Sequence, residues 1–103
     1  TGTHDNDTSS GWYHSASERA QDKLRRYLST DGSHISWDMI RCALSSVSRM
    51  AIIPIQDIFE DGSDRRMNIP GVAQGNWGYR YYKEQFHDGL KKGLREMSEI
   101  YGR

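Results

Sequence analysis

The feature that most constrains the fold of this chain is a short, continuously apolar run over residues 50–55, bounded by polar residues. Such a run is typical of a strand that is buried on both faces of a parallel sheet. Pro54 weakens this prediction, because proline cannot donate to a sheet ladder and is usually kept to edges or bulges. Since one strand cannot satisfy its backbone groups without neighbours, the pattern predicts a chain that lacks its sheet partners.

Three other segments carry apolar residues at helical spacing and are predicted to be helices. The first covers residues 16–29, with Ser15 as the N-cap of a capping box. The second is capped by Ser36 and carries the clearest apolar stripe, formed by Trp37, Met39, Ile40, Ala43, Leu44 and Val47. The third spans residues 86–101, where two internal glycines each cost about 1 kcal/mol relative to alanine, so this helix should depend on tertiary packing.

Two segments are predicted to be loops. Residues 1–11 are dense in Thr, Ser, Asp, Asn and Gly, which bond their own backbone or tolerate unusual dihedral angles. Residues 56–82 are rich in Gly and Asp and show no sustained period. A loop of this length inside a compact domain is uncommon and is usually functional.

Composition limits the size of the core and the class of partner. With 103 residues, 35% of them hydrophobic, the chain has little apolar surface to bury, and its stability alone should be marginal. The net charge is zero, which argues against nucleic acid or an anionic membrane as a partner. No apolar run approaches the length of a membrane span. Residues 1–8 are polar rather than signal-like and lack an initiating Met, as expected of an excised piece.

The single cysteine, Cys42, cannot form an internal disulfide. It lies in an apolar periodic segment, which favours a buried thiol over a nucleophile. Because a lone thiol fits a reducing compartment, we expect a cytoplasmic protein.

The densest polar cluster gathers two carboxylates, an imidazole and an amide on a predicted loop, in the run His4, Asp5, Asn6, Asp7 and Thr8. Asp5 and Asp7 have the one-residue spacing that EF-hand calcium loops use. Counted from Asp5, however, Ser10 stands at the sixth position in place of glycine, and Ala16 stands at the twelfth in place of glutamate. These departures argue against a metal site.

Two other interpretations of this cluster stay open from its residues alone. In one, it is a carbohydrate or hydrolytic site, where a carboxylate grips sugar hydroxyls or stabilises positive charge on a sugar ring while His4 donates a hydrogen bond. In the other, which residue chemistry favours, it is an Asx-rich turn that caps the next helix.

Residues 1–8, with the sequence Thr-Gly-Thr-His-Asp-Asn-Asp-Thr, resemble a short signature region of the 4-alpha-glucanotransferases of glycoside hydrolase family 77. Gly11 and Trp12 follow as in that family's pattern. Five later segments resemble the family's C-terminal end in the same order, namely residues 37–41, 51–57, 66–71, 75–77 and 94–103. Separated motifs that together cover nearly the whole chain make this resemblance highly specific.

The resemblance implies that residues 1–103 are a C-terminal fragment of a TIM (β/α)8 barrel, from the end of the seventh strand to the final helix. The expected fold class is therefore α/β, mostly helical, with the one buried strand over residues 50–55. A complete barrel needs about 250 residues, so the N-terminal part of the same barrel would be the missing partner. Active sites of such barrels lie at the C-terminal face, onto which both predicted loops would open.

For function, the resemblance implies transfer of α-1,4-glucan segments between maltooligosaccharides through a covalent glycosyl-enzyme. Retaining enzymes of this kind use a nucleophilic carboxylate and an acid/base carboxylate, and neither has a counterpart in this chain. Asp5 would be a third catalytic carboxylate that stabilises the transition state. His4 would bond the same sugar, and Asn68 is the next candidate for a sugar contact. We expect no cofactor and no metal, and an inactive chain in isolation.

Two other function classes compete with this interpretation. A stand-alone carbohydrate-binding module is suggested by Trp12, Trp77 and the aromatic residues of 79–82, although packing is a simpler role for the last group than sugar stacking. A helical nucleic-acid binder would use the basic residues Lys23, Arg25, Arg26, Lys91, Lys92 and Arg95. The zero net charge argues against this third class.

Overall fold

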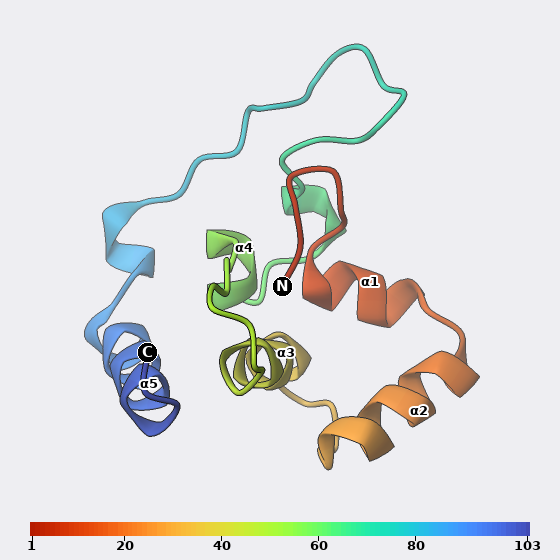
Figure 1. Ribbon diagram of the computed structural model, residues 1–103. Coiled ribbons are helices and arrows are strands. Elements are labelled where there is room, and N and C mark those ends of the chain that lie inside the picture. The colour runs from red at the N-terminus through yellow and green to blue at the C-terminus, as the bar shows by residue number, and fades with distance from the viewer.

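The computed structural model describes all residues from 1 to 103. The chain forms α-helices joined by loops and two short 3-10 helices, and it contains no strand (Figure 1). The helices are α1 (Ser9–Ser15), α2 (Glu18–Leu28), α3 (Ile35–Leu44), α4 (Ile55–Ile58) and α5 (Asp88–Ile100), and the 3-10 helices are η1 (Ser63–Arg65) and η2 (Lys83–Gln85). The radius of gyration is 14.2 Å. A compact domain of this length would measure about 13 Å, so the chain is loosely packed.

The strand predicted over residues 50–55 is absent, so the α/β fold class with one buried strand is wrong for this chain. The amides of residues 50–53 donate no backbone hydrogen bond, and the Ile52 carbonyl accepts one from the Thr1 nitrogen. Met50 and Ile52 are 73% and 68% exposed, so the run is not buried either. Without neighbouring strands these residues stay irregular, and Pro54 then serves as the N-cap position of α4.

The N-terminal loop is shorter than predicted, because α1 begins at Ser9. Thr8 caps this helix by accepting a 3.0 Å hydrogen bond from the Gly11 amide through its hydroxyl oxygen. Serine and glycine are weak helix formers, so helical spacing and propensity gave no sign of α1. The helix predicted over residues 16–29 is confirmed as α2, although Ser17 rather than Ser15 caps it.

The second predicted helix is confirmed as α3, but its ends differ from the prediction. Ser36 is not the cap; it lies inside the first turn, fully buried, and its hydroxyl has no hydrogen-bond partner. Val47 lies beyond the end of the helix and is fully exposed. Cys42 is a free thiol and only partly buried, so the prediction of a buried thiol holds in part.

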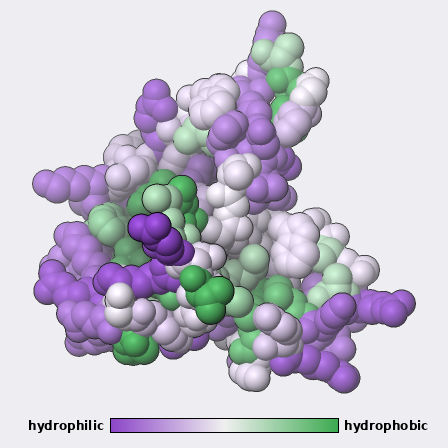
Figure 2. Space-filling model, viewed as in Figure 1, coloured by the Kyte–Doolittle hydropathy of each residue, from purple (hydrophilic) through white to green (hydrophobic).

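The hydrophobic core lies where α3, α4 and α5 meet, and its buried members are Ile40, Leu44, Ile58 and Met97. Partly buried residues surround it, including Trp37, Ile53, Ile55, Phe59, Leu90 and Leu94. The third predicted helix is thus confirmed, since α5 packs on this core. Only 12 of the 103 residues are buried, so the core is small. Apolar side chains accordingly lie open near the middle of the face seen in Figure 2.

The long loop predicted over residues 56–82 is interrupted by α4 and η1. Beyond η1 the chain arcs away from the helices and returns through η2 to α5 (Figure 1). The helices themselves are all too short or too polar to cross a membrane.

Gly11 lies at a close approach between α1 and η1. A Cβ there would be 2.6 Å from Oδ1 of Asp7 and 2.8 Å from the Ser63 nitrogen, and it would also collide with the Ser63 hydroxyl. We expect Gly11→Ala to lower the free energy of unfolding by about 1–3 kcal/mol, because overpacking forces the backbone to shift. Urea unfolding measures this loss. Gly78→Ala is the control, since its Cβ meets nothing within 4 Å; equal stability of the two variants would contradict the prediction.

Candidate functional site

Asp5 lies at the tip of a tight turn that joins Thr3 to Asn6. The Asn6 amide donates to the Thr3 carbonyl at 3.1 Å. The Asn6 side-chain oxygen accepts in return from the Thr3 amide at 2.7 Å and from the Thr3 hydroxyl at 3.1 Å. The predicted Asx-rich turn is therefore present, and Thr8 beyond it caps α1. This turn presents Asp5 outward, with its side chain 53% exposed.

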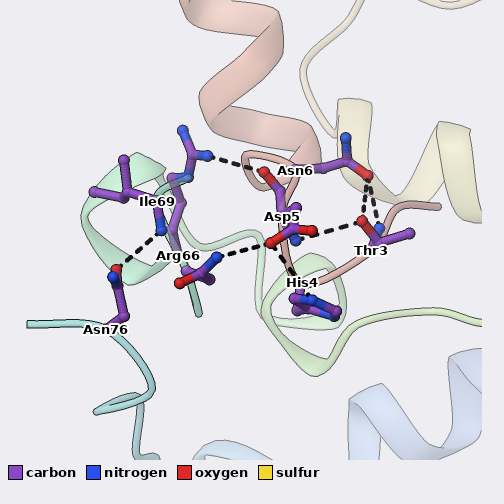
Figure 3. Close-up of polar contacts among 8 residues, drawn as sticks. Thr3, His4, Asp5, Asn6, Arg66, Ile69 and Asn76 are labelled. Carbon is purple, nitrogen blue, oxygen red and sulfur yellow. Dashed lines mark hydrogen bonds and ion pairs between the residues drawn. The ribbon is translucent and has the colours of Figure 1, made fainter. Parts of the chain in front are cut away.

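Two side chains from the distant loop after η1 reach Asp5 (Figure 3). The Asn68 amide nitrogen donates to Oδ1 of Asp5 at 2.7 Å. Nη2 of Arg66 donates to the Asp5 backbone carbonyl at 3.1 Å. Nε2 of His4 lies 3.4 Å from the same Oδ1. The structure thus brings together His4, Asp5 and Asn68, the three residues that the sequence singled out.

The loop that carries Asn68 is held in shape by Asn76. The Asn76 side-chain oxygen accepts from the Ile69 amide at 2.9 Å (Figure 3). The Asn76 side-chain nitrogen donates to the Val72 carbonyl at 2.7 Å. One asparagine therefore closes the turn that follows Asn68. These two hydrogen bonds of Asn76 order an otherwise irregular segment, and the Asn68 amide beside it is thereby held within reach of Asp5.

Trp77 extends the cluster on the His4 side. The two rings lie 5.0 Å apart, centroid to centroid, at a tilt of 41°. The Trp77 backbone has a φ of +62°, which is strained for a side chain other than glycine. Its amide donates to the Met67 carbonyl at 2.7 Å, and this bond secures the conformation. In the sequence, Trp77 belongs to the family-like segment 75–77 and is a candidate sugar contact only in the carbohydrate-binding module. The structure places it beside His4 and so adds it to this site.

Arg66 had no predicted role, although it lies two residues before Asn68 in the same motif. Its Nε is buried without a hydrogen-bond partner, while Nη2 reaches Asp5. An arginine in a polar motif does not by itself indicate a functional residue. Its contact with Asp5 spans 61 residues, so no local pattern could have revealed it.

A cleft of about 510 Å³ opens beside this cluster. His4, Asn6, Arg66 and Trp77 form its polar and aromatic walls, and its apolar lining includes Ile52, Pro54, Ile55 and Met67. Asp5 does not line the cleft itself, but both of its chain neighbours do. The volume falls within the range of about 300–1,000 Å³ that is usual for small-molecule sites.

A second cleft, of about 500 Å³, shares Arg66 with the first and is also lined by residues 79–82. The Tyr79 hydroxyl donates to Asp61 at 2.8 Å, and burial together with this bond raises the pKa of the Tyr79 phenol. The Tyr81 ring packs on Phe59 at 5.3 Å. The predicted packing role therefore holds for these two tyrosines, while Tyr82 is 79% exposed.

No group of three or more His, Cys, Asp and Glu side chains is placed to hold a metal ion. Asp7, the second carboxylate of the calcium interpretation, is engaged by protein groups instead. Its Oδ2 accepts from the Ser63 hydroxyl at 2.7 Å, and its Oδ1 accepts from the Thr8 amide at 2.8 Å. Asp7 thus ties the turn to η1, and Asp5 is the carboxylate that stays accessible.

Comparisons with known proteins agree on one family. The model of the glycoside hydrolase 77 family, described as 4-alpha-glucanotransferase, matches residues 1–85. A 4-alpha-glucanotransferase from Synechocystis sp. is 51% identical over 100% of this chain and 21% of its own length. The chloroplastic/amyloplastic 4-alpha-glucanotransferase from Solanum tuberosum is 44% identical over 100% of this chain and 19% of its own length.

The solved structures give the same answer. An amylomaltase from Streptococcus agalactiae, in complex with acarbose, superposes on all of this chain with a TM-score of 0.95 at 31% identity. The match covers 21% of that protein, so the chain spans about a fifth of the length of the relatives it matches. These relatives are enzymes and do not favour a stand-alone carbohydrate-binding module. The resemblance inferred from the sequence motifs is confirmed, and the chain belongs to the 4-alpha-glucanotransferases of glycoside hydrolase family 77.

Proposed function

We propose that this chain forms part of an enzyme that transfers α-1,4-glucan segments from one maltooligosaccharide to the 4-hydroxyl of another glucan or of glucose. The observation that carries the proposal is the convergence of His4 and Asn68 on the accessible carboxylate of Asp5, beside a cleft, in a chain of this family. Retaining glycosidases pass through a covalent glycosyl-enzyme formed by a nucleophile and an acid/base carboxylate about 5–5.5 Å apart. Those two groups would come from the four fifths of the relatives that the chain does not match.

The role proposed for Asp5 is to stabilise the positive charge that develops on the sugar ring in the transition state. The two carboxylate oxygens of Asp5 differ in their hydrogen bonding, and this difference suits the proposed role. Oδ1 accepts from Asn68 and faces His4, whereas Oδ2 has no partner within the protein. One oxygen is therefore fixed in position and the other is free to accept from sugar hydroxyls.

His4 and Asn68 would act as sugar contacts that also orient Asp5. Both side chains carry donors, and a pyranose ring offers hydroxyls that accept and donate. Trp77 would add an apolar face to the same subsite, since the residue is 57% exposed and lines the cleft beside His4. Aromatic side chains together with a few specifically placed polar groups are typical of small-molecule binding sites.

The test is an assay of the full-length enzyme with maltotriose as the only substrate. Transfer predicts the release of glucose together with maltooligosaccharides longer than maltotriose, which chromatography separates. Glucose and maltose without longer products would indicate hydrolysis, and no turnover would refute the proposal. The isolated 103-residue chain is the control and is expected to release no glucose, because the proposed nucleophile is not part of it.

A further inference from the structure

Asp57 is a buried carboxylate that the proposed reaction does not use. It lies on α4 with only 2% of its surface exposed, so it cannot touch a glucan in the cleft. Burying a carboxylate is costly unless hydrogen bonds compensate it. The hydrogen-bond donors to Asp57 therefore indicate its structural role.

Both oxygens of Asp57 bind the N-terminal segment. Oδ1 accepts from the Ser9 amide at 2.8 Å, and Oδ2 accepts from the Ser9 hydroxyl at 2.9 Å. The Thr1 hydroxyl also donates to Oδ2. Thr1 and Ser9 stand on either side of the loop that carries His4 and Asp5, so one carboxylate holds both ends of this loop.

The same carboxylate links the loop to the hydrophobic core. Ile58, the next residue along α4, is buried in the core with Ile40 of α3. Trp37 reinforces α4 by donating from its indole nitrogen to the Ile58 carbonyl at 3.2 Å. The loop ends are thereby fixed to the best-packed part of the chain, although the loop itself is mostly exposed.

We propose that Asp57 is a positioning residue, which holds the loop so that Asp5 keeps its distance from Asn68 and from the reacting sugar. This inference rests on the proposed transferase function. Misplacing a catalytic group by about 1 Å can cost on the order of 100-fold in rate. Loops position catalytic groups less well than helices unless their own supports are rigid.

The first experiment compares variants of the full-length enzyme. Asp57→Ala leaves the Ser9 amide and two hydroxyls without their acceptor. We expect its kcat for transfer to fall by at least about tenfold while KM changes by less than about threefold, because loop displacement affects the transition state more than ground-state binding. Asp57→Asn keeps one acceptor oxygen and should restore most of the lost kcat.

Asp61→Ala is the matched control. Asp61 follows α4 in the chain and accepts from Tyr79, but it makes no hydrogen bond to residues 1–9. This variant should lose stability while its kcat stays within about twofold of the wild type. A kcat of Asp57→Ala within about twofold of wild type, or the same loss in both variants, would overturn the positioning role.

The second experiment is hydrogen exchange, which does not depend on activity. Asp57→Ala should speed exchange of the Ser9 amide and of residues 2–8, and Asp61→Ala should not. Unchanged exchange in Asp57→Ala would overturn the inference. If the wild type fails to transfer glucan but exchange rises as expected, the proposed function fails and the anchoring of the loop stands.

Should Asp57→Ala not fold, a milder change replaces it. The double variant Thr1→Val and Ser9→Ala removes the two hydroxyl partners and leaves Asp57 in place. We expect faster exchange over residues 2–8 and a kcat lowered by about threefold or more. Wild-type kcat and exchange in this double variant would overturn the inference.

Discussion

Replacing Asp5 by asparagine in the full-length enzyme is expected to lower kcat for transfer from maltotriose by about 1,000-fold, within the range that a lost transition-state contact costs in other enzymes. The change preserves the volume of the side chain and removes its negative charge. An oxocarbenium-like transition state carries positive charge that the ground state lacks. The loss should therefore appear equally in kcat and kcat/KM, as for an interaction made only in the transition state.

The fold should tolerate this substitution. The Asp5 side chain is about half exposed, and the turn that carries it is closed by the backbone of Thr3 and the side chain of Asn6. Exposed substitutions of this kind usually change stability by no more than about 0.5 kcal/mol. The melting temperature of Asp5→Asn should accordingly match that of the wild type, as measured by calorimetry.

Asp64→Asn provides the control for removing a negative charge from the same region. Asp64 lies on η1 with its side chain 83% exposed, and it forms no hydrogen bond or ion pair with Asp5. Its kcat should stay at the wild-type value. Glucose release from maltotriose at a near-normal rate by Asp5→Asn would refute the role assigned to this carboxylate.

The helical part of the fold was predictable because its signal is local. Apolar residues at helical spacing identified α2, α3 and α5, and Met97 and Leu94 of α5 do pack against the core. The boundaries were less predictable, since Ser15 and Ser36 offer the same capping chemistry as Ser17. The backbone path decides the outcome: the Ser17 hydroxyl meets the free Ala20 amide at the start of α2, whereas α3 starts after His34 without a side-chain cap.

The errors have a common physical cause. The start of helix α1 is held by Asp57, which accepts from the Ser9 amide and lies 48 residues from Ser9 in the chain. The strand predicted over residues 50–55 does not form, because no other segment of this chain pairs with its backbone groups, although the apolar pattern is typical of a buried strand. In both cases distant groups decide the local structure, and a local pattern cannot report them.

In the candidate site, too, contacts within one motif were predictable and contacts between distant motifs were not. His4 and Asp5 are adjacent, so their proximity needed no structure, and the resemblance of a second motif was enough to single out Asn68. The contacts that join the two motifs span 61 and 63 residues. Arg66 and Asp57 were therefore missed as supports of Asp5, because neither lies near it in the sequence.

Asn68→Asp is the second substitution for which we expect a large effect, a fall in kcat of about 100-fold at neutral pH. The wild-type Asn68 amide donates to Oδ1 of Asp5 at 2.7 Å. A carboxylate in its place offers no donor and puts a second negative charge within hydrogen-bond distance of the first. Two carboxylates so close cannot both ionise readily, and they share a proton.

The Asn68→Asp variant should also need a higher pH than the wild type for activity. Charge repulsion makes the pair retain a proton to higher pH than a single carboxylate does. The form in which Asp5 carries its negative charge is then reached only at higher pH. The acid limb of the kcat/KM profile should accordingly move to higher pH, and activity should recover in part as the pH rises.

Asn68→Ala separates this charge effect from the loss of a hydrogen bond. Alanine removes the donor and adds no charge, so kcat should fall by about tenfold, as for one lost hydrogen bond, and the acid limb should stay in place. Profiles of kcat/KM against pH for the wild type and both variants make the comparison. If the acid limbs of Asn68→Asp and Asn68→Ala coincide, a carboxylate at position 68 does not change the pH at which Asp5 becomes charged. The 2.7 Å contact between Asn68 and Asp5 would then serve only to hold the loop.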